Sequence, residues 1–266
     1  MVIKIKKFKI DKMDLHSMIY IVAKRNSGKT VLVRDILYHI GKKYPVAMVI
    51  SPTEKMNRNF GDHIPPVFLH EEYSDALLGK LLTRQKSIVT QYNENNSINP
   101  NCVLVLDDCL GSAAEMRKDV NYQTIFVNGR HYKLNVIMTS QYILALTPLQ
   151  RGNIDYVFLL LDNNKSNIKK YYEQFGGMFD TFEEFKKVYQ KLTENYGVMV
   201  IDNKVRSSKI EDCVFYYKVN LNQPNFSDFK ICDQKFWDID VNAIIRRNKE
   251  LVKQKVNSDP NTIVIE

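Results

Sequence analysis

Residues 18–30 read MIYIVAKRNSGKT, and this stretch decides the fold. Its first part, MIYIVA, is a continuous apolar run of strand length, as is typical of a strand buried on both faces of a parallel sheet. Its second part, from Ala23 to Thr30, has the spacing of a phosphate-binding loop, and we predict a helix over residues 29–41 directly after it. A strand, such a loop and a helix in this order indicate an α/β protein that binds nucleotide phosphates.

The loop binds phosphate by a known physical mechanism. Its backbone N–H groups point into a concavity that holds phosphate oxygens, and the helix N-terminus adds the positive end of its dipole. We expect Lys29 to reach the β- and γ-phosphates and Thr30 to place its hydroxyl on Mg²⁺. The residues expected to bind the nucleotide are Lys24, Arg25, Asn26, Ser27, Gly28, Lys29 and Thr30.

One position of the loop departs from the consensus, because Ala23 stands where glycine is usual. If the backbone needs a positive φ at this position, alanine costs about 1 kcal/mol relative to glycine. If the backbone lies in an allowed region, nothing is lost.

A second apolar strand, CVLVL at 102–106, ends in the pair Asp107-Asp108. An apolar strand that ends in an acidic residue is the Walker B pattern of P-loop enzymes. Two adjacent carboxylates repel each other unless a cation or a proton lies between them, so the pair favours a metal site. We expect Asp107 to hold Mg²⁺ and Asp108 to orient and polarise the attacking water.

A third strand, predicted at LNVIMTS (134–140), is followed by Gln141. In ATPases of this class, a polar group on the strand beside the aspartates senses the γ-phosphate; Gln141 is the first candidate and Thr139 the second. Arg130 precedes this strand and Arg151 follows it. Either arginine is a candidate for stabilising transition-state charge from a neighbouring subunit, since a guanidinium supplied in trans can do this.

The rest of the chain alternates predicted strands with predicted helices, which indicates a mostly parallel sheet covered by helices on both faces. Ligands of such sheets bind beyond the carboxyl ends of the strands, so we expect the chemistry just after residues 23, 106 and 140. The further strands are expected at 2–10 (an edge strand), 46–50, 67–70, 87–91 and 155–161, and the further helices at 71–84, 113–131, 165–175 and 180–195.

The C-terminal part is expected to differ from the core. Residues 197–202 and 213–219 are predicted to form a terminal hairpin, residues 240–255 a basic helix and residues 256–266 a tail. We therefore divide the chain into a P-loop core with an N-terminal edge strand, residues 1–202, and an appendage packed on that core, residues 203–266.

Composition excludes several classes of protein. The chain has 266 residues, of which 44 % are hydrophobic and 26 % charged, which excludes a disordered chain, a collagen-like chain and a small disulfide scaffold. We expect no membrane span, since no apolar run approaches the roughly 18–20 residues that a membrane helix needs. We also expect no signal peptide, since MVIKIKKFKI lacks an apolar core. The four cysteines have no zinc-site spacing and are expected to be reduced thiols of an intracellular protein.

With these motifs in this order, the chain resembles the poxvirus-type genome-packaging ATPases of large DNA viruses, which belong to the FtsK–HerA superfamily. The resemblance covers residues 18–161 and rests on the P-loop, VLVLDD, NGRHYKLNVIMTSQ and LQRGN. It implies a RecA-like core, hydrolysis of ATP with Mg²⁺, a homo-oligomeric ring and translocation of double-stranded DNA into a preformed capsid. It further implies a capsid or portal component as a partner, and a location in the host cytoplasm, in the virion or in both.

The resemblance also assigns roles to single residues. It implies that Lys29 and Thr30 bind phosphate and magnesium, that Asp107 binds magnesium, that Asp108 is the catalytic carboxylate and that Gln141 is the sensor. Arg130 matches the arginine that precedes the sensor strand in FtsK-like motors. Asp108 stands where many relatives carry Glu, and the shorter carboxylate implies slow hydrolysis.

The charge of the chain agrees with a nucleic-acid partner. The formal net charge is +8, from 38 Lys and Arg against 30 Asp and Glu, and a basic chain favours a polyanion. In a ring, pore loops would contact DNA, and we look first at 112–121, which contains Arg117 and Lys118. Two clusters are candidates for contacting phosphates without sequence preference: Lys4, Lys6, Lys7, Lys9 and Lys12, and Arg246, Arg247, Lys249, Lys253 and Lys255.

Two other functions stay open at this stage. One is a different P-loop enzyme, such as a nucleotide kinase or a GTPase. A GTPase needs Asn-Lys-x-Asp after a late strand, and residues 164–167, NKSN, lack the final Asp; an Arg-rich lid of the kind found in nucleotide kinases is not evident either. The other is a nucleotide-binding scaffold without hydrolysis, a hypothesis motivated by Ala23.

Overall fold

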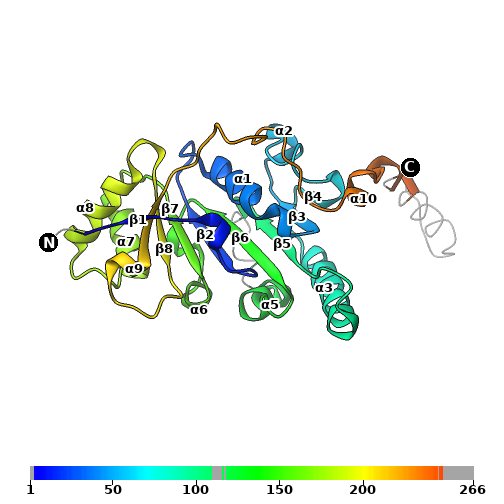
Figure 1. The fold of residues 1–266 in the computed structure, drawn as a ribbon, viewed down its shortest axis with the longest axis horizontal. Coiled ribbons are helices and arrows are strands. Elements are labelled where there is room, and N and C mark those ends of the chain that lie inside the picture. The colour runs from blue at the N-terminus through cyan, green and yellow to red at the C-terminus, as the bar shows by residue number, and fades with distance from the viewer. Residues whose placement is uncertain (1–2, 110–115, 117, 245, 248–266) are drawn as a thin grey trace, which may run out of the picture.

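A computed structural model describes residues 3–109, 116, 118–244 and 246–247. These residues form a sheet in the strand order β1-β9-β8-β7-β2-β6-β5-β3-β4 (Figure 1). Neighbours from β7 through β4 are parallel, β8 is antiparallel to both of its neighbours, and β1 is parallel to β9. The predicted mostly parallel sheet is therefore confirmed.

The elements have the following bounds. The strands are β1 Lys6–Lys7, β2 Met18–Val22, β3 Val46–Ile50, β4 Leu69–His70, β5 Cys102–Leu106, β6 Leu134–Ser140, β7 Tyr156–Leu159, β8 Val198–Asp202 and β9 Val214–Tyr217. The α-helices are α1 Lys29–Ile40, α2 Glu54–Asn57, α3 Asp75–Asn95, α5 Val120–Asn128, α6 Pro148–Gly152, α7 Lys165–Phe175, α8 Phe182–Thr193, α9 Ile210–Cys213 and α10 Gln234–Trp237. Short 3-10 helices are η1 Ile10–Lys12, η2 Gly41–Lys43, η3 Pro66–Phe68, η5 Ile143–Ala145 and η6 Glu194–Tyr196.

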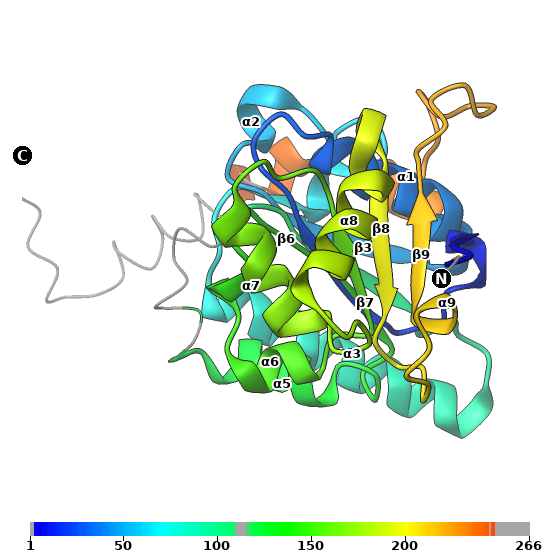
Figure 2. The ribbon, with the colours of Figure 1, turned by 90° about the vertical axis from the view of Figure 1, so that its left-hand side faces the viewer.

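Helices cover both faces of the sheet, as Figures 1 and 2 show. Successive residues of a strand point to opposite faces, so Tyr20 and Val22 of β2 join one core cluster while Ile19 and Ile21 join the other. The first cluster packs against α3, α5, α7 and α8, and the second packs against α1. This two-sided burial explains why the central strands are continuous apolar runs.

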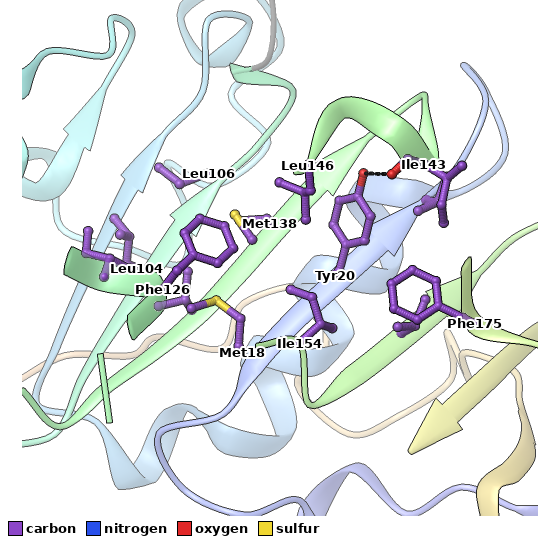
Figure 3. Close-up of a cluster of buried hydrophobic side chains, with 14 of the residues drawn as sticks. Met18, Tyr20, Leu104, Leu106, Phe126, Met138, Ile143, Leu146, Ile154 and Phe175 are labelled. Atoms are coloured by element: carbon purple, nitrogen blue, oxygen red, sulfur yellow. Dashed lines mark hydrogen bonds between the residues drawn. The ribbon is translucent and has the colours of Figure 1, made fainter. Parts of the chain in front are cut away.

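A buried tyrosine in the first cluster connects the central strand to the loop after β6. The Tyr20 hydroxyl donates to the carbonyl oxygen of Tyr142 at 3.0 Å. It also donates to the carbonyl oxygen of Ile143 at 3.5 Å, as Figure 3 shows. Burial raises the pKa of Tyr20 above its ordinary value, so the hydroxyl remains a donor. The contact fixes the chain just beyond Gln141.

The predicted strand at 87–91 is wrong, because residues 75–95 form the single helix α3. The β-branched residues in SIVTQ indicated a strand, but such propensities are weak and packing overrides them. Ser74 caps the helix by accepting from Leu77 N, and Gln85 is buried and donates to the carbonyls of Pro100 and Tyr132. These contacts hold the middle of the helix in place, and the left-handed Asn96 ends it.

The N-terminal end of the chain also differs from the expected element, whereas the hairpin predicted from residues 197–202 and 213–219 is formed by β8 and β9. The N-terminal edge strand is shorter than predicted, since only Lys6–Lys7 pairs with β9. The expected domain boundary at residue 202 falls between β8 and β9, which are paired neighbours in the sheet. Beyond β9 the chain returns to the other half of the sheet, where Asp233 N donates to Pro45 O at 2.9 Å.

The structure describes part of the predicted basic helix. Within the range 240–255, residues 241–244, 246 and 247 are helical. Residues 245 and 248–266, which include the predicted tail, lie outside the described residues.

The four cysteines are free thiols. In the part of the chain that the structure describes, no helix combines the length and apolar character needed to cross a bilayer.

Candidate functional site

The expected site lies where the carboxyl ends of three central strands meet. In the sheet, β6 lies between β2 and β5, with Val22 opposite Ser140 and Leu106 opposite Met138. The hydrogen bond from Ala23 N to Ser140 O, at 2.9 Å, continues this ladder into the phosphate loop. The loop, the two aspartates and Gln141 therefore lie side by side at the carboxyl ends of the parallel strands.

The phosphate loop has the backbone that its sequence requires. Gly28 caps α1 at φ 90° and ψ 14°, a left-handed conformation that glycine adopts without steric cost. Asn26 has φ 60°, which asparagine tolerates better than most residues. The Ser27 hydroxyl donates to Lys24 O at 2.6 Å and closes the turn.

Ala23 fits the loop without backbone strain. It is buried and its φ is not positive, so the position does not need the freedom of glycine. Its methyl group belongs to the core cluster under α1. The replacement of the usual glycine therefore carries no conformational cost here.

Lys29 and Gln141 converge on the carboxylate of Asp108. Lys29 Nζ lies 3.3 Å from Asp108 Oδ2, and Gln141 Nε2 donates to the same oxygen at 2.9 Å. Asp108 has φ 54°, a left-handed conformation, and its backbone N–H donates to Thr139 Oγ1 at 3.0 Å. Its side chain is 36 % exposed, so it remains accessible to water. The structure thus brings together three residues that lie far apart in the sequence.

Asp107 lies deeper than Asp108 and has a different environment. Thr139 Oγ1 donates to Asp107 Oδ1 at 2.7 Å, and Ser51 Oγ lies 3.4 Å from Asp107 Oδ2. Burial raises the pKa of Asp107 above its ordinary value, while the Thr139 hydrogen bond and the charge of Lys29 oppose this shift. A cation beside Asp107 would favour its ionised form.

These oxygen donors fit Mg²⁺. Asp107 provides a carboxylate, Ser51 and Thr139 provide hydroxyls beside it, and Thr30 provides a hydroxyl in the first turn of α1. Among the described residues, no group of three or more His, Cys, Asp and Glu forms a metal site of its own. Mg²⁺ is usually held by one or two carboxylates together with the phosphates of a substrate.

Two residues of the site region were not predicted from the sequence. Ser51 directly follows β3, and Asp162 follows β7 and the apolar run YVFLLL. Asp162 is buried, and its Oδ1 pairs with Lys24 Nζ at 2.8 Å. Burial alone would raise the pKa of Asp162, but the contact with Lys24 and three further hydrogen bonds lower it below its ordinary value. An apolar strand that ends in an acid, the signal that identified Asp107, would also have found Asp162.

The contact with Asp162 gives Lys24 a structural role. Its ammonium group is held just beyond the end of β7, which fixes the second residue of the phosphate loop between the ends of β2 and its neighbour β7. Arg25 and Asn26 are exposed at the tip of the loop.

The two candidate arginines do not reach this site within one chain. Arg130 precedes β6 and pairs with Asp155, which precedes β7 and accepts from Met18 N at 2.7 Å. These residues mark the amino edge of the parallel strands, opposite the phosphate loop. Arg151 lies on α6, and its guanidinium donates to Leu146 O.

The basic clusters lie far from each other. The five lysines near the N-terminus are exposed around β1, at one edge of the sheet, whereas Arg246 and Arg247 follow α10 near the opposite end of the molecule (Figure 1). Lys118 is exposed. Residues 112–115, Arg117, Lys249, Lys253 and Lys255 lie outside the described residues.

Comparison with known proteins places the chain among viral proteins. The Poxvirus A32 protein family matches residues 5–240. The uncharacterized protein L437 of Acanthamoeba polyphaga mimivirus is 38 % identical over 237 residues, covering 87 % of this chain and 83 % of that protein. The uncharacterized protein 075L of Invertebrate iridescent virus 6 is 36 % identical, covering 76 % of this chain and 77 % of that protein.

A solved structure shares the fold. The genome packaging NTPase B204 from Sulfolobus turreted icosahedral virus 2, in complex with AMPPCP, aligns with a TM-score of 0.52 and 13 % identity. The alignment covers 78 % of this chain and 100 % of that one. At this identity the similarity shows the fold alone.

Proposed function

Because the chain belongs to the Poxvirus A32 protein family, we propose that it is a Mg²⁺-dependent ATPase that drives double-stranded DNA into a viral capsid. One observation carries the proposal: Lys29, Asp108 and Gln141 converge beside the buried Asp107 at the edge where the phosphate loop emerges. The shared fold with a protein described as a genome packaging NTPase supports the same conclusion.

Each residue of the site has a separate role in hydrolysis. The backbone N–H groups of the loop hold the phosphates, and Lys29 neutralises charge on the β- and γ-phosphates. Asp108 accepts a hydrogen bond from the attacking water and orients it, while Gln141 fixes the orientation of that carboxylate. Asp107 and Thr30 would hold Mg²⁺, which would neutralise the charge that develops on the phosphate oxygens.

Replacing Thr139 by valine should change the pH dependence of hydrolysis. The variant loses the hydrogen bond that stabilises the carboxylate form of Asp107, so the pKa of Asp107 rises further above its ordinary value. The protonated form, which binds Mg²⁺ poorly, then persists to higher pH. We expect the acid limb of the pH–rate profile to move to higher pH in Thr139→Val.

The matched control is Thr139→Ser, which keeps the hydroxyl donor and should keep the wild-type acid limb. Both variants are compared by steady-state hydrolysis from about pH 4.5 to 8 at fixed free Mg²⁺. The pH steps are close enough to resolve the titration of an Asp. Identical acid limbs in Thr139→Val and the wild type would show that Asp107 does not limit activity.

The packaging function predicts shared active sites. We propose that the chain works as a homo-oligomeric ring and that Arg130 of one copy acts on the nucleotide of its neighbour. The Arg130 side chain is 65 % exposed although it pairs with Asp155, whereas Arg151 is only partly exposed and donates to a backbone carbonyl of its own chain. A guanidinium supplied in trans contributes about 10³–10⁵-fold to turnover.

The test is ATP hydrolysis against protein concentration, with and without double-stranded DNA. We expect a steep concentration dependence, stimulation by DNA and strongly reduced turnover in Lys29→Ala and in Arg130→Lys, which keeps a cation beside Asp155. A mixture of these two variants should recover activity, because some interfaces then combine an intact loop with an intact arginine. A rate per chain that is independent of both concentration and DNA would overturn the proposal.

Ala23 gives no reason to prefer a non-hydrolysing scaffold. That hypothesis depended on strain at the position of the usual glycine, and the backbone of Ala23 does not have a positive φ. We further propose a capsid or portal component as the partner and the host cytoplasm, the virion or both as the location.

A further inference from the structure

An apolar cavity of about 260 Å³ opens directly beside the phosphate loop. Ser27 and Gly28 of the loop form one of its walls. The other walls come from α1, the end of β7, the start of β8 and the segment after β9. The apolar side chains that line it include Val31, Leu160, Tyr196, Val198, Val219 and Leu221.

Tyr196 stands at the rim of this cavity in an unusual backbone conformation. Asn195 has φ 52° and ψ 50°, and Tyr196 has φ 61°, so two successive non-glycine residues are left-handed. A Cβ atom at Gly197 would lie 2.1 Å from Leu192 O, so the next position accepts only glycine. Such a backbone is strained and persists where the surrounding structure enforces it, often at ligand sites.

The strained turn leaves the Tyr196 ring exposed beside the loop. Its side chain is 75 % exposed, and a Cβ atom built on Gly28 would lie 3.9 Å from Tyr196 Cδ1. Among the described residues, no other aromatic ring stacks on Tyr196. Val31 and Leu221 of the same cavity are also exposed, at 36 % and 63 %. An aromatic face and apolar walls are therefore available next to the position of the phosphates.

We propose that Tyr196 and this cavity bind the base of the nucleotide whose phosphates lie in the loop, and that they accept adenine and guanine alike. The inference rests on the proposed function, because it requires a nucleoside triphosphate at the loop. The cavity is assigned to the base because it is continuous with the phosphate site, with which it shares Ser27 and Gly28.

The tolerance for both purines follows from the chemistry of the lining. A site rejects the wrong base strongly only when fixed donors and acceptors are left unpaired by it; apolar contacts discriminate far less. In this cavity the Ser27 hydroxyl already donates to Lys24 O, and Lys218 is an exposed cation. Stacking on an aromatic ring does not depend on the hydrogen-bonding edge of the base.

The test measures binding of three probes to the full chain at fixed Mg²⁺ by calorimetry. The probes are the β,γ-methylene analogues of ATP and GTP and inorganic tripolyphosphate, which lacks a base. For the wild type, we expect the two analogues to bind within about tenfold of each other and both to bind more tightly than tripolyphosphate.

The variants separate stacking from other effects. Tyr196→Ala should weaken both analogues by about tenfold or more, since stacking contributes about 1–3 kcal/mol per base, and should leave tripolyphosphate binding unchanged. Tyr196→Trp should keep wild-type affinity because it keeps an aromatic face. Tyr216→Ala, which truncates a half-exposed tyrosine on β9 that does not line the cavity, should change none of the three.

The outcomes also separate this inference from the proposed function. Unchanged analogue binding in Tyr196→Ala, or a preference of about 10³-fold for one purine, would overturn the inference. If Lys29→Ala still stops hydrolysis in that case, the proposed ATPase stands. Analogue binding that depends on Tyr196 in a wild-type chain that never hydrolyses ATP would instead support the base site and overturn the ATPase.

Discussion

Replacing Lys29 by alanine should lower ATP hydrolysis by about 10³-fold and weaken nucleotide binding. The Lys29 side chain is only 11 % exposed, and its ammonium group lies 3.3 Å from Asp108 Oδ2. Its positive charge also lowers the pKa of Asp107, which burial raises. Removing it deprives the phosphates of a fixed cation and leaves two adjacent carboxylates facing them, so both ground-state binding and transition-state stabilisation are lost.

The matched control is Lys42→Ala, which removes an exposed lysine just after the other end of the same helix. Phosphate release and nucleotide affinity, measured beside a thermal unfolding curve, separate loss of chemistry from loss of fold. We expect Lys42→Ala to behave as the wild type in all three measurements. Wild-type turnover in Lys29→Ala would contradict the assignment of residues 23–30 as the phosphate site.

Most of the sheet could be predicted from the sequence because its central strands are buried on both faces. β2, β3 and β5 contain only apolar residues, so each is recognisable as a continuous apolar run. The segment 87–91, SIVTQ, contains β-branched residues typical of strands but belongs to α3, and the tertiary contacts of that helix decide its structure. Local patterns cannot report contacts that residues far away in the chain provide.

The residues of the site that could be predicted are those that directly follow a predicted strand or its phosphate loop. Lys29, Asp108 and Gln141 follow three buried strands, and their convergence follows from the parallel order of those strands. Thr139, expected as the second sensor candidate, also bridges the aspartates: it donates to Asp107 and accepts from the backbone N–H of Asp108. The sequence could not show this because side-chain direction at a strand end depends on the register with the neighbouring strand. Ser51 was missed because a single serine after a strand carries no motif.

Replacing Asp108 by asparagine should stop turnover while preserving nucleotide binding. Asparagine has nearly the same shape and tolerates the left-handed φ of 54° at this position, so the fold should persist. The amide cannot take a proton or polarise water as the carboxylate does, and loss of such a group costs about 10²–10⁴-fold in rate. Single-turnover hydrolysis measures this loss directly.

Nucleotide affinity should not fall in Asp108→Asn and is expected to rise. In the structure Lys29 pairs with Asp108, and a phosphate must compete with that carboxylate for the ammonium group. A neutral amide competes less, so the variant should bind ATP more tightly than the wild type. The direction of the change in affinity distinguishes Asp108 from Asp107. Asp107→Asn removes the buried carboxylate expected to hold Mg²⁺ and should weaken Mg²⁺-dependent binding instead.

The left-handed backbone at Asp108 also favours aspartate over glutamate at this position. A left-handed conformation is tolerated best by short polar side chains, and a longer residue costs about 1–2 kcal/mol there. Asp108→Glu should therefore lower stability but, unlike Asp108→Asn, retain turnover, because its carboxylate still reaches the water. If Asp108→Asn and Asp108→Glu both kept wild-type turnover, Asp108 would not be the catalytic carboxylate; if both lost affinity in proportion to rate, its role would be in binding rather than in hydrolysis.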